Sequence, residues 1–262
     1  ILVTTSDQYL HLLKPYTILF NKYWPNQNVT ILGFDNTSIP ELPNNFDFVS
    51  LGNQNDFENY WSDPLIPYID EVKEEYFVIM MGDFFLTDYV DIKRLKLLED
   101  EIISGNADKA LLDTHLSAYT TEYKTNIRKI LQEIGRTTLH PSIWKKEYFK
   151  KYLKPKLTAW DFEVQNMPES QRDRATIIIP ACPSGITSTD PAEIMLASAV
   201  NNIIKATNVY VKGVPFPRWG TNLPWGAPAG IKKEDILLIY DYIDPAKRPK
   251  IESILEDGKI YK

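Results

Sequence analysis

The chain has 262 residues, of which 44% are hydrophobic and 24% are charged, the composition of an ordinary globular protein. Its formal net charge of -6 argues against a protein that holds a nucleic acid along its length, because that task needs clustered Lys and Arg. The single cysteine, Cys182, excludes an intramolecular disulfide, and no apolar run reaches the roughly 18 residues of a membrane span. These features predict a cytoplasmic protein in a reducing compartment.

Strand and helix signals alternate over the first 115 residues. Short apolar or β-branched runs predict strands at 1–5, 29–34, 46–51, 76–81 and 110–112. Helical spacing of apolar residues predicts helices at 10–20, 57–72 and 91–104. Such alternation is typical of a mostly parallel sheet with right-handed crossovers.

The second half is less regular and richer in proline. Its apolar pattern predicts strands at 136–143, 175–180 and 208–214, and helices at 145–152, 161–166, 232–243 and 245–255. The stretch 216–230 is rich in Pro, Gly and Trp, which favours a long ordered loop.

The sharpest candidate for chemistry is Asp83, which follows Gly82 after the apolar run 77–81. In open α/β sheets, ligands bind outside the carboxyl ends of the strands. A carboxylate there is costly to bury unless its charge is compensated, and Mg²⁺ bound to a diphosphate would compensate it. A side chain that only caps the next turn is the alternative.

The segment 76–88 resembles the DxD-bearing strand of GT-A glycosyltransferases, and more narrowly a group of bacterial and phage-type glycosyltransferase-like proteins. That group also tends to carry Pro-Ser-x-x-Trp and a later Trp-x-x-Glu, which stand here at 141–144 and 160–163. Trp61-Ser62 fits the group as well, and the matching blocks lie between residues 1 and 165.

The resemblance implies an α/β fold of the GT-A (Rossmann-like) type, with a mixed, mostly parallel sheet flanked by helices and a less regular C-terminal region. It implies a single domain over residues 1–262, in which 1–115 bind the nucleotide sugar and 116–262 bind the acceptor.

The sequence departs from the group at Gly82, which stands where the first aspartate of the pair is expected. Only Asp83 then remains as a metal ligand. GT-A enzymes often take another ligand from a C-terminal His, and the histidines here are His11, His115 and His140. We therefore expect Mn²⁺ or Mg²⁺ to be held loosely by Asp83 and the diphosphate, or to be absent.

The resemblance assigns further residues to the nucleotide sugar, at strand ends and in the later loop. They are Thr5, Ser6, Asp7, Tyr9, Asn53, Asp56, Trp61, Gly82, Asp83 and Arg218. Some have structural alternatives, since Ser6-Asp7 suits a helix cap and Trp61 suits a core. The loop 216–230 resembles a lid, from which Arg218 would stabilise the leaving diphosphate.

The catalytic candidates are Asp161 and Glu163. Inverting transfer needs a carboxylate within hydrogen-bond reach of the acceptor hydroxyl. At a helix start only one of the two can face the donor. Glu163 holds the family-like position and Asp161 suits an N-cap, so both stay candidates, with a slight preference for Asp161. The acceptor-binding candidates are His140, Ser142, Trp144 and Trp160.

Together these features predict transfer of a sugar from a nucleoside diphosphate sugar, expected to be UDP-linked, to a hydroxyl acceptor. A sugar-phosphate nucleotidyltransferase is one rival, but it would want a Gly-rich, basic loop after the first strand, and residues 4–8 contain neither type. A non-catalytic protein that binds nucleotide sugars or glycans is the other. The acceptor stays open between a glycan, a lipid-linked glycan, a protein and a modified DNA base.

Overall fold

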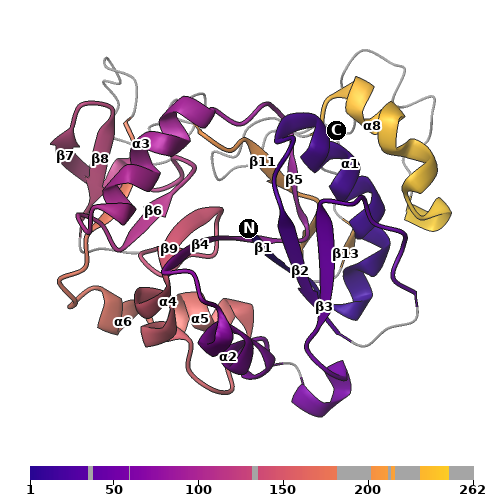
Figure 1. The fold of residues 1–262 in the computed structure, drawn as a ribbon, viewed down its shortest axis with the longest axis horizontal. Helices are drawn as coiled ribbons and strands as arrows, with labels where there is room; N and C mark the ends of the chain where they lie inside the picture. Colours follow the sequence, from indigo (N-terminus) through magenta and orange to yellow (C-terminus); the bar gives the residue numbers. More distant parts are fainter. Residues whose placement is uncertain are drawn as a thin grey trace.

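The computed structural model describes residues 1–34, 38–58, 60–131, 135–181, 202–211, 214–215 and 231–247. In this part of the chain, nine strands form one sheet in the order β3-β2-β1-β4-β9-β6-β10-β8-β7, and helices flank it (Figure 1). Two small pairs, β11–β5 and β12–β13, complete the strands.

The strands of the large sheet are β1 (Leu2–Thr4), β2 (Val29–Gly33), β3 (Phe46–Ser50), β4 (Tyr76–Met81), β6 (Lys109–Leu111), β7 (Thr120–Lys124), β8 (Ile127–Ile130), β9 (Ser142–Lys145) and β10 (Ile177–Pro180). β9 is antiparallel to both its neighbours, and so is β8. The other strands therefore share one direction. The fold class predicted from sequence, a mixed and mostly parallel α/β sheet, is confirmed.

The smaller pairs join β5 (Phe84–Leu86) to β11 (Ala206–Asn208) and β12 (Tyr210–Val211) to β13 (Val214–Pro215). The α-helices are α1 (Leu13–Tyr23), α2 (Ser62–Glu71), α3 (Ile92–Ile103), α4 (Lys146–Tyr152), α5 (Ala159–Gln165), α6 (Met167–Ser170) and α8 (Lys233–Ile239). Short 3-10 helices are η1 (Asp7–Leu12), η2 (Gln54–Phe57), η3 (Ser117–Tyr119), η5 (Tyr240–Tyr242) and η6 (Pro245–Lys247).

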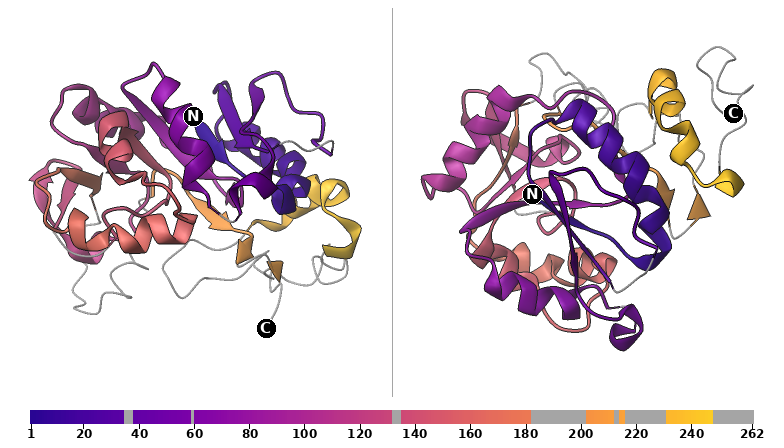
Figure 2. Two further views of the ribbon diagram at one scale, coloured as in Figure 1. Left: turned by 90° about the horizontal axis from the view of Figure 1, so that it is seen from below. Right: turned by 45° about the vertical axis from the view of Figure 1, so that its right-hand side comes forward.

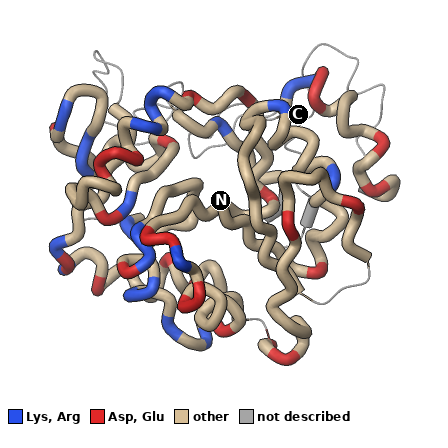
Figure 3. Tube along the Cα trace, viewed as in Figure 1, with Lys and Arg blue, Asp and Glu red and all other residues tan. Residues whose placement is uncertain are grey.

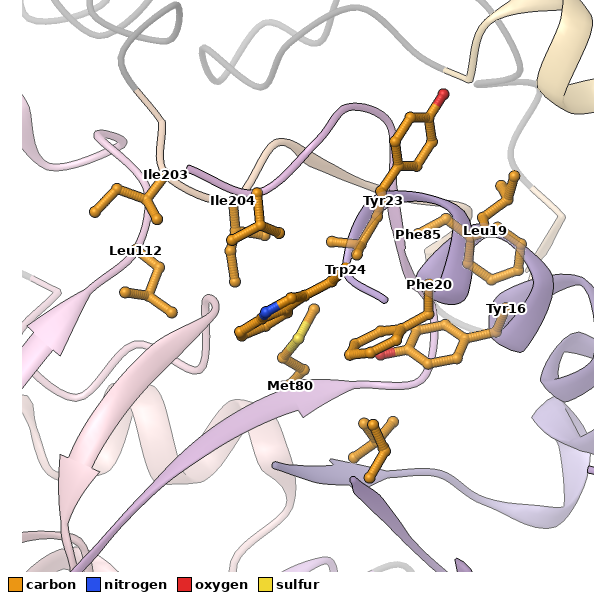
Figure 4. Packing of buried hydrophobic residues seen from close by; sticks show 14 of the residues in the cluster. Tyr16, Leu19, Phe20, Tyr23, Trp24, Met80, Phe85, Leu112, Ile203 and Ile204 are labelled. Carbon is orange, nitrogen blue, oxygen red and sulfur yellow. The ribbon is translucent and has the colours of Figure 1, made fainter. Parts of the chain in front are cut away.

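Each face of the sheet has its own apolar core, because successive residues of a strand point to opposite faces. In β1, Val3 packs with α1, α3 and α8, whereas Leu2 packs with α2, α4 and α5. On the first face, Phe20 of α1 and Trp24, which follows α1, lie over Met80 of β4 (Figure 4). The two rings stack at 5.6 Å between centroids. This packing fixes β4, the strand that leads to Asp83.

Helix α8 lies beside α1 although the two are far apart in sequence (Figure 2). The Asp235 side chain is fully buried between them and accepts hydrogen bonds from Lys22 and Tyr23. A buried carboxylate requires such partners. The C-terminal helix is therefore attached to the first helix through one buried ionic contact.

The predicted strands of the first half are confirmed, each to within one residue at its ends. Several expectations of secondary structure need correction. The helix expected at 57–72 starts at Ser62, because 54–57 form η2 instead. The strand expected at 136–143 starts only at Ser142, since the carbonyls of Arg136 and Thr138 turn to the Lys109 ammonium group at 3.1 and 2.7 Å.

The segment 208–214, expected to be a strand, is not one strand: β11 ends at Asn208, and β12 and β13 follow as separate short strands. The predicted helix 232–243 divides into α8 and η5. The predicted helix at 245–255 begins as η6, and its remainder lies outside the described residues, as does the loop 216–230.

Charged residues of both signs lie around the periphery of the fold, and the strands β1, β2 and β4 carry none (Figure 3). In the described part of the chain, no helix combines the length and the apolar character needed to cross a membrane.

Candidate functional site

A cavity of about 580 Å³ opens at the carboxyl ends of β1 and β4. That volume lies within the usual range for small-molecule sites, and the place is where open α/β sheets bind ligands. On one side it is lined by Thr4, Thr5, Ser6, Gln8 and Tyr9 at and after the end of β1, by Phe34 after β2, and by Gln54, Glu58, Tyr60 and Trp61 between β3 and α2. Its floor is made by Met81, Gly82, Asp83, Phe84 and Asn208, and its far wall by Leu139, His140, Thr158, Ala159, Trp160 and Glu163.

The hydroxyls of Thr5 and Ser6 are buried beside the cavity and have no hydrogen-bond partner in the described part of the chain. Ser6 occupies the N-cap position of η1, yet its side chain makes no capping hydrogen bond. Buried polar groups are nearly always paired in folded proteins. Two unpaired hydroxyls at a strand end are therefore available to a ligand.

Gly82 lies tight against β1. Its N–H donates to the Thr4 carbonyl at 2.8 Å, and a Cβ atom added there would stand 3.3 Å from the Thr4 carbonyl oxygen and 3.4 Å from Thr5 Oγ1. A larger side chain would press on the Thr5 hydroxyl. The close approach of the Thr4 carbonyl oxygen is a physical reason for a glycine at this position.

The Asp83 carboxyl lies at the cavity floor, where burial raises its pKa to about 7, although hydrogen bonds from its own backbone and from the Asn208 side chain oppose this. The carbonyl of Asp83 accepts from the Val209 N–H at 2.8 Å. Burial therefore favours the protonated form of this carboxyl, and a bound cation would favour its ionised form.

The two carboxylates predicted as catalytic have different surroundings. Asp161 belongs to a capping box with Thr158, and its two oxygens accept from Thr158 Oγ1 at 2.6 Å and Gln165 Nε2 at 2.9 Å. These hydrogen bonds lower the pKa of Asp161, and the bond from the Thr158 side chain has the largest effect. Asp161 does not line the cavity, whereas Glu163 does. Glu163 Oε1 accepts from the Leu139 N–H and from Thr138 Oγ1.

Of the four acceptor candidates, two line the cavity. Trp160 is 72% exposed at the rim, and His140 forms part of the wall. Ser142 and Trp144 are instead fully buried in β9. Ser142 Oγ donates to the His140 carbonyl at 2.6 Å, and the Lys109 ammonium lies 3.9 Å from the centre of the Trp144 ring. Both belong to the core.

The nucleotide candidates divide in the same way. Thr5, Ser6, Tyr9, Trp61, Gly82 and Asp83 line the cavity. Asn53 and Asp56 are exposed outside it, and Asn53 Oδ1 caps η2 by accepting from the Asn55 N–H at 3.0 Å. Asp7 does not line it either, but its N–H donates to Gln54 Oε1 at 2.8 Å. Arg218 lies outside the described residues.

Sequence reasoning missed a polar cluster behind the far wall. Asp113 follows β6, and its two carboxylate oxygens lie 2.5 Å from His115 Nδ1 and 2.7 Å from His140 Nδ1. The imidazole rings stack at 3.7 Å between centroids. The signal in the sequence is an Asp-x-His directly after a strand, but its partner His140 stands 27 residues further on.

Within the cluster, the carboxylate and the two imidazoles shift one another's pKa values. Burial alone would raise the pKa of Asp113, but the two imidazoles hold it well below its usual range. Burial lowers the pKa of His115. Burial acts the same way on His140, yet the Asp113 carboxylate outweighs it and raises the pKa of His140.

One donor atom from each of Asp113, His115 and His140 lies within 4.8 Å of the other two, so this triad could hold a metal ion. In the arrangement described, however, both Nδ1 atoms are at hydrogen-bond distance from the carboxylate, and the rings lie side by side. Metal ligands converge on a point about 2 Å from each donor atom. The observed contacts are those of a hydrogen-bonded cluster.

No protein-family model matches the sequence, and no curated protein matches it. Solved structures do resemble the fold. A cytidylyltransferase from Leptospira borgpetersenii is 12% identical, with a TM-score of 0.40 over 65% of this chain and 70% of its own. TarS from S. aureus is 14% identical, with a TM-score of 0.45 over 76% of this chain and 64% of its own. A CMP:2-keto-3-deoxy-manno-octonic acid synthetase is 10% identical, with a TM-score of 0.40 over 68% of this chain and 87% of its own.

The likeness to these proteins is low in both sequence and superposition, and it concerns the α/β fold. Any assignment of a reaction to this chain therefore rests on its own cavity. Among the described residues that line it, Glu58, Asp83 and Glu163 are acidic and none is Lys or Arg.

Proposed function

We propose that the protein is a transferase that moves a sugar from a nucleoside diphosphate sugar to a hydroxyl acceptor. We propose UDP as the nucleotide of this donor. The observation that carries the proposal is the strand-end site, in which the unpaired hydroxyls of Thr5 and Ser6 lie in one cavity with the partly buried Asp83. Hydroxyls of this kind suit the ribose and phosphate oxygens of a nucleotide.

The donor needs a counter-charge, because the described lining of the cavity is acidic. Asp83 fits a divalent cation such as Mg²⁺ or Mn²⁺, since one carboxylate together with diphosphate oxygens is a common ligand set for Mg²⁺. When bound, such a cation would stabilise the negative charge of the leaving diphosphate. Arg218 is a second proposed source of positive charge.

The acceptor is proposed to enter between the far wall and the exposed ring of Trp160, which could stack on a sugar or a base. Within α5, we propose that Asp161 serves to cap the helix and that Glu163 is the carboxylate that reaches the site. This division follows from the capping bonds of Asp161 and the place of Glu163 in the cavity wall.

The proposal is tested by thermal shift with UDP-glucose, UDP-galactose, UDP-N-acetylglucosamine and GDP-mannose, each with and without Mn²⁺. A ligand present at 100 times its dissociation constant stabilises the folded protein by about 2.7 kcal/mol. We expect a Mn²⁺-dependent rise in melting temperature that Asp83→Asn abolishes. Asp47→Asn is the matched control, because Asp47 is an exposed aspartate on β3 outside the cavity.

Release of the free nucleotide separates the competing functions. A glycosyltransferase releases UDP from the donor. The release is slow when water accepts the sugar and faster when the true acceptor does. A nucleotidyltransferase would instead release pyrophosphate from a nucleoside triphosphate and a sugar phosphate. A binding protein would show the thermal shift and release neither product.

A further inference from the structure

We propose that His140, oriented by Asp113, is the base that takes the proton from the acceptor hydroxyl. This inference rests on the proposed function and names the proton acceptor that the two predicted carboxylates leave unassigned. It is built from the cluster of Asp113, His115 and His140 behind the far wall of the cavity.

The fold brings the two partners together through neighbouring strands. Asp113 follows β6 and His140 precedes β9, and β6 pairs with β9 in the sheet. The Leu112 N–H donates to the Pro141 carbonyl at 2.9 Å, which joins the two segments next to the cluster. On the other side, the N–H and Oγ1 of Thr114 donate to Asn202 Oδ1 at 2.8 and 2.7 Å. The carboxylate is thus held on a rigid part of the structure.

Asp113 determines which nitrogen of His140 carries a proton. An ionised carboxylate only accepts, so His140 Nδ1 must donate to the Asp113 oxygen 2.7 Å away. In the neutral ring, Nε2 then carries the lone pair. The His140 side chain is 35% exposed, against 10% for Asp113, and its ring lines the cavity. The lone pair is therefore on the ring nitrogen that Asp113 does not occupy, and we assign proton transfer to that atom.

His115 completes the arrangement. It occupies the second oxygen of Asp113 at 2.5 Å and stacks against the His140 ring. With one oxygen bonded to each imidazole, the carboxylate cannot rotate away without losing both bonds. The stacked ring also prevents His140 from tilting in that direction. His115 is thus a support, and its side chain is only 17% exposed.

The charged groups around His140 favour a proton on the ring once it has been taken. The carboxylates of Asp113 and Glu163 raise the pKa of His140, whereas burial and the nearby Lys109 lower it. Lys109 is fully buried, and burial lowers its own pKa well below the usual value. A ring whose pKa is raised holds the transferred proton more firmly, which suits a general base.

Neither predicted carboxylate is as well placed. Both oxygens of Asp161 are used within its own helix. Glu163 accepts from Leu139 and Thr138, the two residues that precede His140. Glu163 is therefore a positioning residue for the segment that carries the base.

The step balances as a single displacement. His140 Nε2 takes the proton of the acceptor O–H, and the oxygen forms a bond to the anomeric carbon. The bond from that carbon to the diphosphate oxygen breaks, and its electron pair leaves with the diphosphate. When water replaces the acceptor, the same step is donor hydrolysis, which the test can measure without knowledge of the acceptor.

The experiment measures UDP release from the UDP-sugar that gives the largest thermal shift, as a function of pH, for wild type, His140→Gln, Asp113→Asn and His11→Gln. Wild type should gain activity as pH rises through the raised pKa of His140. His140→Gln should lose about 10²–10⁴-fold in kcat and lose this rising limb. Asp113→Asn should keep a limb but move it to lower pH, because the carboxylate that raises the pKa of His140 is gone. His11 does not line the cavity, so His11→Gln should match wild type.

A second readout needs no turnover. The chain has three histidines, so long-range ¹H–¹⁵N spectra can be assigned with the same variants. We expect neutral His140 to carry its proton on Nδ1 and to titrate above 6.5 in wild type, and at lower pH in Asp113→Asn. A folded His140→Gln that still shifts with the UDP-sugar shows that binding survives and that only the proton acceptor was removed.

Several results would overturn the inference while leaving the proposed function intact. They are UDP release by His140→Gln at the wild-type rate, a pH limb that Asp113→Asn does not move, and neutral His140 protonated on Nε2. A stoichiometric zinc ion in the purified protein, lost in Asp113→Asn, would also overturn it. If wild type releases no UDP from any donor, the proposed function itself fails.

Discussion

Replacement of Asp83 by Asn should stabilise the protein in the absence of metal. Burial raises the pKa of Asp83 to about 7 from an ordinary value of 3.8. Well below pH 3.8 the carboxyl is protonated in both the folded and the unfolded state, so it has no effect there on the free energy of unfolding. As pH rises towards 7, the unfolded state loses this proton first, and the folded state becomes relatively less stable.

The size of the effect follows from the difference of about 3 pKa units between the two states. At 1.36 kcal/mol per unit, the upper limit is about 4 kcal/mol. Asp83 is only partly buried, and solvent reduces such effects, so we expect Asp83→Asn to raise the free energy of unfolding by about 2 kcal/mol at pH 8. The gain should shrink steadily as pH falls and be small by pH 4.5, the lower end of the measured range.

The assay is urea-induced unfolding of wild type, Asp83→Asn and Asp47→Asn at several pH values between 4.5 and 8, with EDTA present. Asp47→Asn should follow wild type throughout. Equal or lower stability of Asp83→Asn at pH 8 would refute the reasoning. Saturating Mn²⁺ and UDP-sugar should reverse the order, because only wild type offers the cation a carboxylate.

Three further predictions concern the cavity and the cores. Gly82→Ala should weaken the affinity for UDP-sugars a few-fold, because its Cβ would stand 3.3 Å from the Thr4 carbonyl oxygen at the cavity floor; calorimetric titration measures this affinity. Trp144→Ala should cost about 3–5 kcal/mol of unfolding free energy because the ring is fully buried, whereas Trp160→Ala should leave stability unchanged and raise the KM for the acceptor; urea unfolding and transfer kinetics with varied acceptor measure these effects. Asp235→Ala should cost about 3–5 kcal/mol, because Lys22 and Tyr23 lose their shared partner; hydrogen exchange should show early opening of α8.

Each of these has a contrary outcome. Unchanged affinity in Gly82→Ala would mean that the close contact of β1 and β4 does not shape the donor site. A Trp160→Ala variant that loses as much stability as Trp144→Ala would contradict their different burial. Uniform loss of protection in Asp235→Ala, without early opening of α8, would show that this helix does not open separately.

The first strands of the sheet and the place of Asp83 could be predicted from the sequence because their signals are local. The apolar run before Asp83 predicts β4 directly, and β4 spans the same residues in the structure. The hairpin of β7 and β8 was missed, since its strands are half-exposed and lack a clear apolar alternation. Its turn carries Asn126 at a φ of 66°, a conformation that asparagine tolerates better than most residues.

The far side of the site could not be predicted, because it depends on β9. This antiparallel strand inserts between β4 and β6 and carries His140 to Asp113. Sequence spacing gives no sign of that juxtaposition. Spacing also could not tell the buried Trp144 from the exposed Trp160, since the difference is set by a central strand in one case and a helix start in the other.

The pairing of β5 with β11 has a consequence for how this site comes into being during synthesis. Residues 203–209 hydrogen-bond along the segment 83–91, through Val209 to Asp83, Thr87 to Lys205 and Asp91 to Ile203. Asn208 supplies the side chain that bonds the Asp83 carboxyl. A chain that has been synthesised only as far as β5 has therefore made the four strands β3-β2-β1-β4 but not the finished cavity. The floor is completed only when β11 has emerged, more than a hundred residues after Asp83, so a nascent or truncated chain should lack the proposed donor site.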